Sequence, residues 1–207
     1  MKYRIITLLL VLMSVSAWAQ GGLKDEFLEE LHAKSADVRT IVSDFVQVKH
    51  NSMLARDAES RGSFKFKHPS RLALIYTDPK DDCVVMGKEE FMVEAGGARN
   101  VVKISSNPLY EQLQQVFTAC FSGDVAALSS EGVFCCEQHE GQYTVRINPD
   151  SKRARRYIAE IVLVFSRQDM LLDELRIVEV SGNYTSYYFK NRQTNLELDD
   201  SLFECKR

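Results

Sequence analysis

The side chains best suited to chemistry in this 207-residue chain are its four histidines and two pairs of adjacent aspartates. The histidines fall in separate predicted elements, at His32, His50, His68 and His139. Asp81–Asp82 and Asp199–Asp200 lie in polar loop segments, where solvated turns are the favoured interpretation. The chain has no G-x-S-x-G turn, no phosphate-binding glycine loop and no H-E-x-x-H motif. These patterns favour a protein that is not an enzyme and needs no cofactor.

Five cysteines supply the other reactive groups. They stand at Cys83, Cys120, Cys135, Cys136 and Cys205. Cys135, Cys136 and His139 match no standard zinc spacing, so structural or free thiols are favoured over a metal site, and a thiol catalyst is least favoured. A disulfide from Cys120 to Cys135 or Cys136 would close a loop of about 16 residues and contribute roughly 3 kcal/mol. The sequence leaves the pairing open.

The N-terminus has the pattern of a secretory signal. Lys2 and Arg4 precede an apolar run over residues 5–15, and residues 17–19, AWA, form a small-x-small cleavage site. The run is too short to span a membrane, so we expect residues 1–19 to be removed. No cysteine follows the cleavage site before Cys83, which predicts a mature chain without a lipid anchor. Residues 20–207 then form a single domain of an exported, disulfide-permissive protein.

The charge pattern argues against a nucleic-acid partner. Loss of the two basic signal residues changes the formal net charge from −3 to −5, whereas nucleic acids attract basic surfaces. One basic cluster is present, at Lys152, Arg153, Arg155 and Arg156. A solvated turn between strands is the favoured interpretation of this cluster. Contact with an acidic partner or with lipid headgroups is the alternative.

Hydrophobic periodicity predicts a mainly β, α+β domain. Residues 23–32 form an amphipathic helix, and a second helix starts with Pro108 and ends at Gly123. Residues 125–129 are a candidate for one further helical turn. Extended or strand patterns occupy residues 41–50, 60–67, 71–77, 83–87, 90–94, 101–105, 134–137, 143–148, 157–166, 171–180 and 184–191. Their spacing predicts antiparallel strands with two or three inserted helices.

Alternation places many apolar side chains on one face of the predicted sheet. They are Phe64, Phe66, Leu72, Leu74, Tyr76, Leu175, Ile177, Tyr187 and Phe189. An apolar face of this kind either packs a core or encloses a ligand. Periodicity alone favours a plain core.

A series of short motifs runs through nearly all of the chain after residue 43. Residues 44–47, DFVQ, contain an F-x-Q pattern, and residues 62–69, GSFKFKHP, fit G-x-(apolar)-x-(apolar)-(basic)-x-P. YTDP at 76–79 and VVMG at 84–87 follow, and the last strands carry Ile177, GNYT at 182–185, Phe189, Asn191, Asn195 and Phe203. In order and spacing these motifs resemble the LolA family of periplasmic lipoprotein carriers.

The resemblance implies an unclosed, half-open antiparallel β-barrel with a helical lid over a hydrophobic cavity. By position in the family pattern, the sheet side of the cavity is lined by Phe64, Phe66, Leu72, Leu74, Tyr76 and Val84. The underside of the lid is formed by Leu109, Leu113, Val116 and Phe117. His68 stands where the carriers have an arginine associated with holding the lid shut. A lid latch and a structural histidine at a turn both remain open for it.

The implied function is a soluble periplasmic carrier that acts as a monomer. It would bind acyl chains of lipoproteins and transfer them from an inner-membrane ABC transporter, the donor, to an outer-membrane acceptor. Two alternatives stay open: a carrier of another amphiphile, such as a glycolipid, and a sensor or interaction module that binds a periplasmic partner. An outer-membrane receptor of similar fold is disfavoured, because such receptors are lipidated and this chain lacks the cysteine for it.

Overall fold

A computed structural model of the chain describes residues 22–106, 108–123, 134–149, 152 and 154–205. The predicted signal segment, residues 1–19, and the candidate helical turn at 125–129 lie outside these described residues. Within the described part, no helix has the length and apolar character needed to cross a lipid bilayer.

Eleven strands form one antiparallel sheet whose two edges do not pair with each other. The order across the sheet is β6-β5-β4-β3-β2-β1-β11-β10-β9-β8-β7. The strands are β1 (Thr40–His50), β2 (Ala58–Lys67), β3 (Arg71–Asp78), β4 (Lys80–Met86), β5 (Glu90–Ala95), β6 (Ala98–Lys103), β7 (Phe134–His139), β8 (Gln142–Ile147), β9 (Ile158–Ser166), β10 (Leu172–Glu179) and β11 (Tyr184–Thr194). Two meanders therefore meet at the long central pair β1–β11, and the barrel stays half open, as the family resemblance implies.

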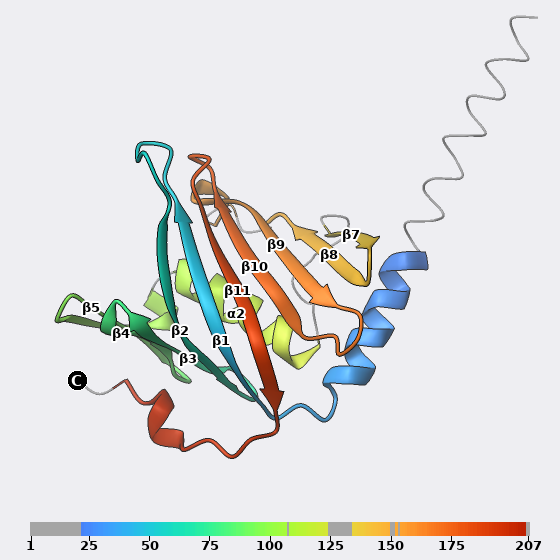
Figure 1. The fold of residues 1–207 in the computed structure, drawn as a ribbon, viewed down its shortest axis with the longest axis horizontal. Coiled ribbons are helices and arrows are strands. Elements are labelled where there is room, and N and C mark those ends of the chain that lie inside the picture. Colours follow the sequence, from blue (N-terminus) through green and yellow to red (C-terminus); the bar gives the residue numbers. More distant parts are fainter. Residues whose placement is uncertain (1–21, 107, 124–133, 150–151, 153, 206–207) are drawn as a thin grey trace, which may run out of the picture.

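Helices cover one face of this curved sheet. The N-terminal helix occupies residues 22–35, and α2 spans Pro108–Ser122 and crosses the sheet behind the central strands in Figure 1. Gly123, at φ +80°, ends α2 in the left-handed conformation that glycine adopts without strain. Short 3-10 turns lie at η1 (Ile104–Ser106), η3 (Ala154–Arg156) and η4 (Asp200–Phe203). The strand and helix positions agree with the predicted ones to within a few residues.

The main core lies between the sheet and the two helices. Phe27 of the N-terminal helix packs on Tyr143 and Phe165, with ring centroids 5.2 and 5.4 Å away. Phe121 of α2 packs on Phe64 and Phe66 of β2, at 5.1 and 4.9 Å. Aromatic contacts therefore fix both helices to the same face of the sheet.

A smaller core lies on the opposite face, where the C-terminal segment crosses β3–β5. Ala73, Val85 and Met92 pack there against Phe203 of η4. Lys67 hydrogen-bonds Asp200 at 2.5 Å and lowers the pKa of its carboxyl group, and Arg71 pairs with the same carboxylate at 3.1 Å. Both faces of β3 are therefore covered, which explains why successive residues of this strand are apolar.

Gly62 marks a position in β2 where only glycine fits. A Cβ built there would lie 2.1 Å from the Ile75 carbonyl oxygen and 2.8 Å from Cε1 of Phe45. The pairing of β2 with β3 shifts register next to Gly62, so the two backbones approach unusually closely at this point.

Replacing Gly62 by alanine should destabilise the fold, because the Ile75 carbonyl cannot move without disturbing β2–β3 pairing. We expect G62A to lower the free energy of unfolding by about 1–3 kcal/mol, measured by urea unfolding followed by circular dichroism. Gly22→Ala is the matched control, since a Cβ at Gly22 meets nothing within 4 Å. G62A as stable as G22A would contradict this account of the β2–β3 contact.

Candidate apolar binding cavity

A cavity of about 580 Å³ lies between the concave face of the sheet and the helical elements α2 and η3. Its walls come from seven strands and two helices, and from the hairpin between β10 and β11. They comprise Gln47, Lys49, Tyr76, Val84, Val93, Leu113, Arg156, Tyr157, Ile158, Ile177, Glu179, Val180, Ser181, Thr185 and Tyr187. Apolar side chains supply most of the wall, and the polar ones gather toward the β10–β11 hairpin.

Strand pairing explains why these apolar side chains share a wall. Val84 of β4 lies directly opposite Val93 of β5, and Ile177 of β10 lies opposite Thr185 of β11. Paired residues in antiparallel strands point to the same face of a sheet. Leu113 faces these strands from α2. The cavity is therefore a hollow in the same concave face that carries the core.

The predicted sheet-side residues divide between the hollow and the packed core. Tyr76 and Val84 line the cavity. The others are almost fully buried, and they are Phe64, Phe66, Leu72 and Leu74. Phe64 and Phe66 lie beneath Phe121 of α2, so this part of the concave face is filled. Their contact with a ligand stays a prediction.

The predicted lid residues show the same division along α2. Leu113 borders the cavity, whereas Val116 and Phe117 are buried in the main core. The side chain of Leu109 lies outside the described part of the structure. The first turn of α2 is held by Tyr110, whose ring stacks on Phe91 of β5 with centroids 4.3 Å apart.

Hydrogen bonds add little to the attachment of α2. Gln114 donates to the Lys88 carbonyl at 3.4 Å, and the Ser35 hydroxyl donates to the Ser122 carbonyl, also at 3.4 Å. Among the residues described, no ion pair joins α2 to the sheet. Apolar packing is the main force that holds the helix over the hollow.

His68 lies exposed in the turn between β2 and β3. Its backbone N–H donates to the Arg39 carbonyl at 2.8 Å, which ties the turn to the segment before β1. Within the described part of the chain, no hydrogen bond links its ring to α2. A latch role for His68 remains an expectation.

Three polar side chains form a connected group on the wall of the cavity. Gln47 is buried, and its amide nitrogen donates to the Tyr187 hydroxyl at 2.7 Å. The Tyr76 hydroxyl donates to the Gln47 carbonyl oxygen at 3.2 Å. Burial raises the pKa of both tyrosines above the ordinary value, and their mutual interaction raises that of Tyr76 further. The group stays uncharged at neutral pH.

Sequence reasoning assigned several of these wall residues to the sheet but not to the site. Ile177 and Tyr187 are on the predicted inward face, and Gln47 belongs to the F-x-Q motif. The period-two pattern that marks Gln47 as inward also marks Lys49, two residues later on the same strand. Arg156 belongs to the predicted basic cluster, and only the folded chain brings it beside the cavity.

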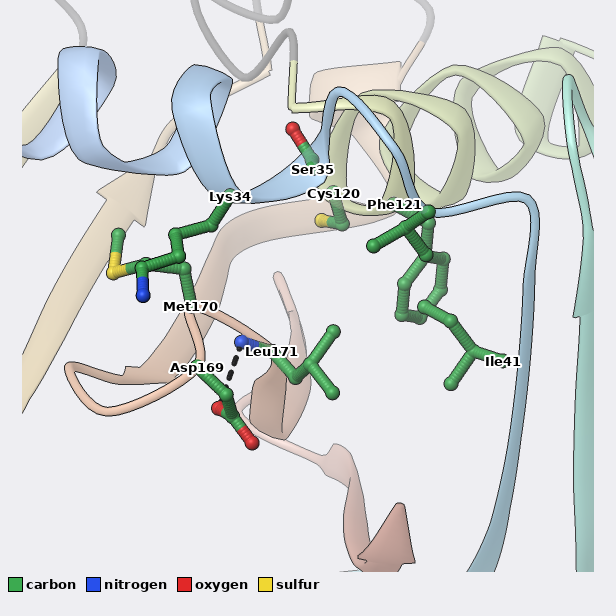
Figure 2. A pocket seen from close by; sticks show the side chains of 9 residues that line it. Lys34, Ser35, Ile41, Cys120, Phe121, Asp169, Met170 and Leu171 are labelled. Atoms are coloured by element: carbon green, nitrogen blue, oxygen red, sulfur yellow. Dashed lines mark hydrogen bonds between the residues drawn. The ribbon is translucent and has the colours of Figure 1, made fainter. Parts of the chain in front are cut away.

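A second hollow, shown in Figure 2, has no room for a ligand. Its volume is about 10 Å³, close to what one water molecule needs. Side chains from the N-terminal helix, the start of β1, α2 and the β9–β10 turn converge on it, including Lys34, Ile41, Phe121 and Met170. This small hollow marks the place where the N-terminal helix and α2 pack against the sheet.

The described residues gather no set of metal ligands, and burial raises the pKa of two thiols near the core. No group of three or more histidine, cysteine or acidic side chains that could hold a metal occurs among them. All five cysteines are free. Burial raises the pKa of Cys136 to about 12 and raises the pKa of the Cys120 thiol as well, so both stay protonated.

Sheet, helix and hollow together define a half-open β-barrel with a helical lid. The family model described as outer membrane lipoprotein carrier protein LolA matches residues 36–206. The outer-membrane lipoprotein carrier protein of Methylococcus capsulatus is 25% identical over 168 residues, which cover 80% of this chain and 76% of that protein. The chain belongs to the LolA family.

One solved structure with a TM-score above 0.5 supports the fold at low sequence identity. A conserved protein from Thermus thermophilus aligns with a TM-score of 0.51 and 7% identity, over 86% of this chain and 91% of its own. A structure of the Pseudomonas aeruginosa MucA/MucB complex aligns with a TM-score of 0.49 and 12% identity, over 87% of this chain and 60% of the matched chain.

The raised pKa values of Tyr76 and Tyr187 predict a loss of stability at high pH. Above pH 10 the unfolded chain ionises these tyrosines while the folded chain keeps them protonated, so stability present below that pH is lost as pH rises. Between pH 10 and 11 Tyr76 should contribute a loss of about 1 kcal/mol, and Tyr187 should add a loss in the same direction. When unfolded by urea at pH 10 and at pH 11, the Y76F/Y187F variant should not show this part of the decrease in the free energy of unfolding.

The exposed Tyr157 supplies the control for this measurement. Y157F should keep the pH dependence of the wild-type protein. If the double variant loses as much stability between pH 10 and 11 as Y157F does, the two buried hydroxyls are not the groups that titrate.

Proposed function

We propose that the protein is a soluble periplasmic carrier, without enzymatic activity, that binds the acyl chains of lipoproteins in the cavity beneath α2. The observation that carries this proposal is the apolar hollow of about 580 Å³, since ligand pockets usually measure about 300–1,000 Å³. Membership of the LolA family and the similarity to a lipoprotein carrier support acyl chains as the cargo.

Burial of an acyl chain supplies enough free energy for tight carriage. Each buried methylene contributes about 0.8 kcal/mol, so a 16-carbon chain contributes roughly 12 kcal/mol. A ligand held this strongly leaves into water too slowly for transport. The carrier must pass it directly to another apolar site, which requires a cavity that can open and close.

Within this proposal α2 is the lid and the sheet is the fixed wall. Tyr76 and Val84 contact the chain together with Leu113, because these three residues already border the hollow. Phe64, Phe66, Leu72 and Leu74 become available when α2 moves, as do Leu109, Val116 and Phe117 on its underside. His68, at the β2–β3 turn, is the proposed latch residue.

The proposed route runs from the inner to the outer membrane. Residues 1–19 direct export and are removed, and residues 20–207 are the carrier domain. An inner-membrane ABC transporter loads the lipoprotein and thereby supplies the energy, since the carrier has no nucleotide-binding motif in its sequence. An outer-membrane acceptor with a competing apolar site receives the chain.

Binding of a fluorescent fatty-acid probe to the purified protein tests the proposal. Leu113→Trp should fill part of the hollow and weaken probe binding by about tenfold or more, because displacing two methylenes already costs that much. The variant should fold normally, since the added ring enters empty space. Solvent extraction of protein purified from the periplasm, followed by mass spectrometry, should identify acyl-chain ligands.

Gln115→Trp is the matched control, because Gln115 is exposed on the same helix. Q115W should bind the probe with wild-type affinity. Absence of probe binding by the wild-type protein, or equal binding by L113W and Q115W, would exclude the cavity as the acyl site. A protein ligand recovered in place of a lipid would favour an interaction module.

A further inference from the structure

Two exposed cations line the cavity. Lys49 projects from the end of β1, and Arg156 comes from η3. Both side chains belong to exposed residues. Neither has a carboxylate partner among the described residues.

Arg156 lacks a carboxylate partner among the described residues, whereas several other arginines of the protein form ion pairs. Arg61, Arg146, Arg176 and Arg192 each pair with acidic side chains within 4 Å. An arginine left without a carboxylate has all five guanidinium N–H donors available for an external anion.

The rim is positive although the chain as a whole is acidic. The cavity lining contains two cations and one carboxylate, Glu179, whereas the formal net charge of the chain is −3. Glu179 already accepts a hydrogen bond from the Ser181 hydroxyl at 3.0 Å. Lys152, four residues before Arg156 in the sequence, is exposed as well.

Apolar surface connects the charged rim to the hollow. Tyr157 and Val180 line the cavity and remain 62% and 59% exposed. The Val180 N–H donates to the Tyr157 carbonyl at 3.0 Å, which holds the two residues side by side. A ligand with a chain in the hollow would pass these side chains and place its polar end between Lys49 and Arg156.

We propose that the cavity mouth binds the acidic headgroup of an amphiphile, a phosphate or carboxylate, whose alkyl chain occupies the hollow. This inference rests on the proposed function and specifies the class of cargo. Arg156 offers planar, paired N–H donors to the anion, and Lys49 offers a mobile point charge. A neutral lipid gains nothing from either cation.

Displacement of a neutral fluorescent probe, N-phenyl-1-naphthylamine, by ligands with the same tail tests this inference. Dodecyl phosphate, dodecanoate and dodecanol are compared at low salt, below the concentrations at which they form micelles. We expect the anionic ligands to bind about tenfold more tightly than dodecanol, the gain typical of a charged hydrogen bond. Inorganic phosphate alone should not displace the probe.

The K49Q/R156Q variant should lose this tenfold preference while its affinity for dodecanol stays within about twofold of the wild type. K65Q/K190Q is the control with the same change in net charge. Lys65 and Lys190 alternate with the inward Phe64, Phe66 and Phe189, so they lie on the other face of the sheet. The control should keep the preference.

Several results would overturn the inference. Equal binding of dodecanol and dodecyl phosphate by the wild-type protein would exclude the headgroup site. The proposal that the protein carries acyl chains would still stand. A preference that survives in K49Q/R156Q, or disappears in K65Q/K190Q, places the anion elsewhere. Loss of binding to phosphatidylglycerol vesicles with an unchanged dodecyl phosphate preference assigns the cations to a membrane surface. If no ligand displaces the probe because none binds, the carrier proposal falls as well.

Discussion

The contact of Phe121 with Phe64 and Phe66 determines which part of the concave face is filled. The Phe121 ring lies 5.1 and 4.9 Å from the other two and fixes the C-terminal end of α2 over β2. α2 has 15 residues and is therefore about 22 Å long, too short to cover a sheet of eleven strands. One end of the helix packs tightly, and the region near Leu113 is left with a hollow.

The way α2 is attached makes its movement energetically feasible. Its buried side chains include Val116, Phe117, Ala119, Cys120 and Phe121, and its Tyr110 ring stacks on Phe91. Its only charged residue is Glu111. Exposing the four large ones, Tyr110, Val116, Phe117 and Phe121, would cost roughly 6–12 kcal/mol at about 1.5–3 kcal/mol each. In the proposed carrier this cost is comparable to the roughly 12 kcal/mol that one 16-carbon chain contributes on burial, so a bound chain would offset most of it.

Strand alternation predicted which side chains face inward, but the depth of each depends on where α2 lies. Phe64 and Tyr76 share the inward face, yet the first is fully buried and the second lines the hollow. The difference comes from the contact of Phe64 with residue 121, which no local pattern encodes. Lys49 could be placed inward by its strand position. Arg156 could not, because its location depends on how β8 connects to β9.

The polar group on the cavity wall is compatible with an alkyl chain because it satisfies its own hydrogen bonds. Gln47 donates to Tyr187 and accepts from Tyr76, and the two hydroxyls interact with each other. Each of the three side chains has a hydrogen-bond partner within the group, so cover by apolar atoms avoids most of the cost of an unpaired polar group, about 1–3 kcal/mol. Lys49 and Arg156 differ, since both are exposed to water at the rim of the cavity. Self-paired polar groups inside and cations at the rim favour one orientation of an amphiphile, with its chain inward and its charge outward.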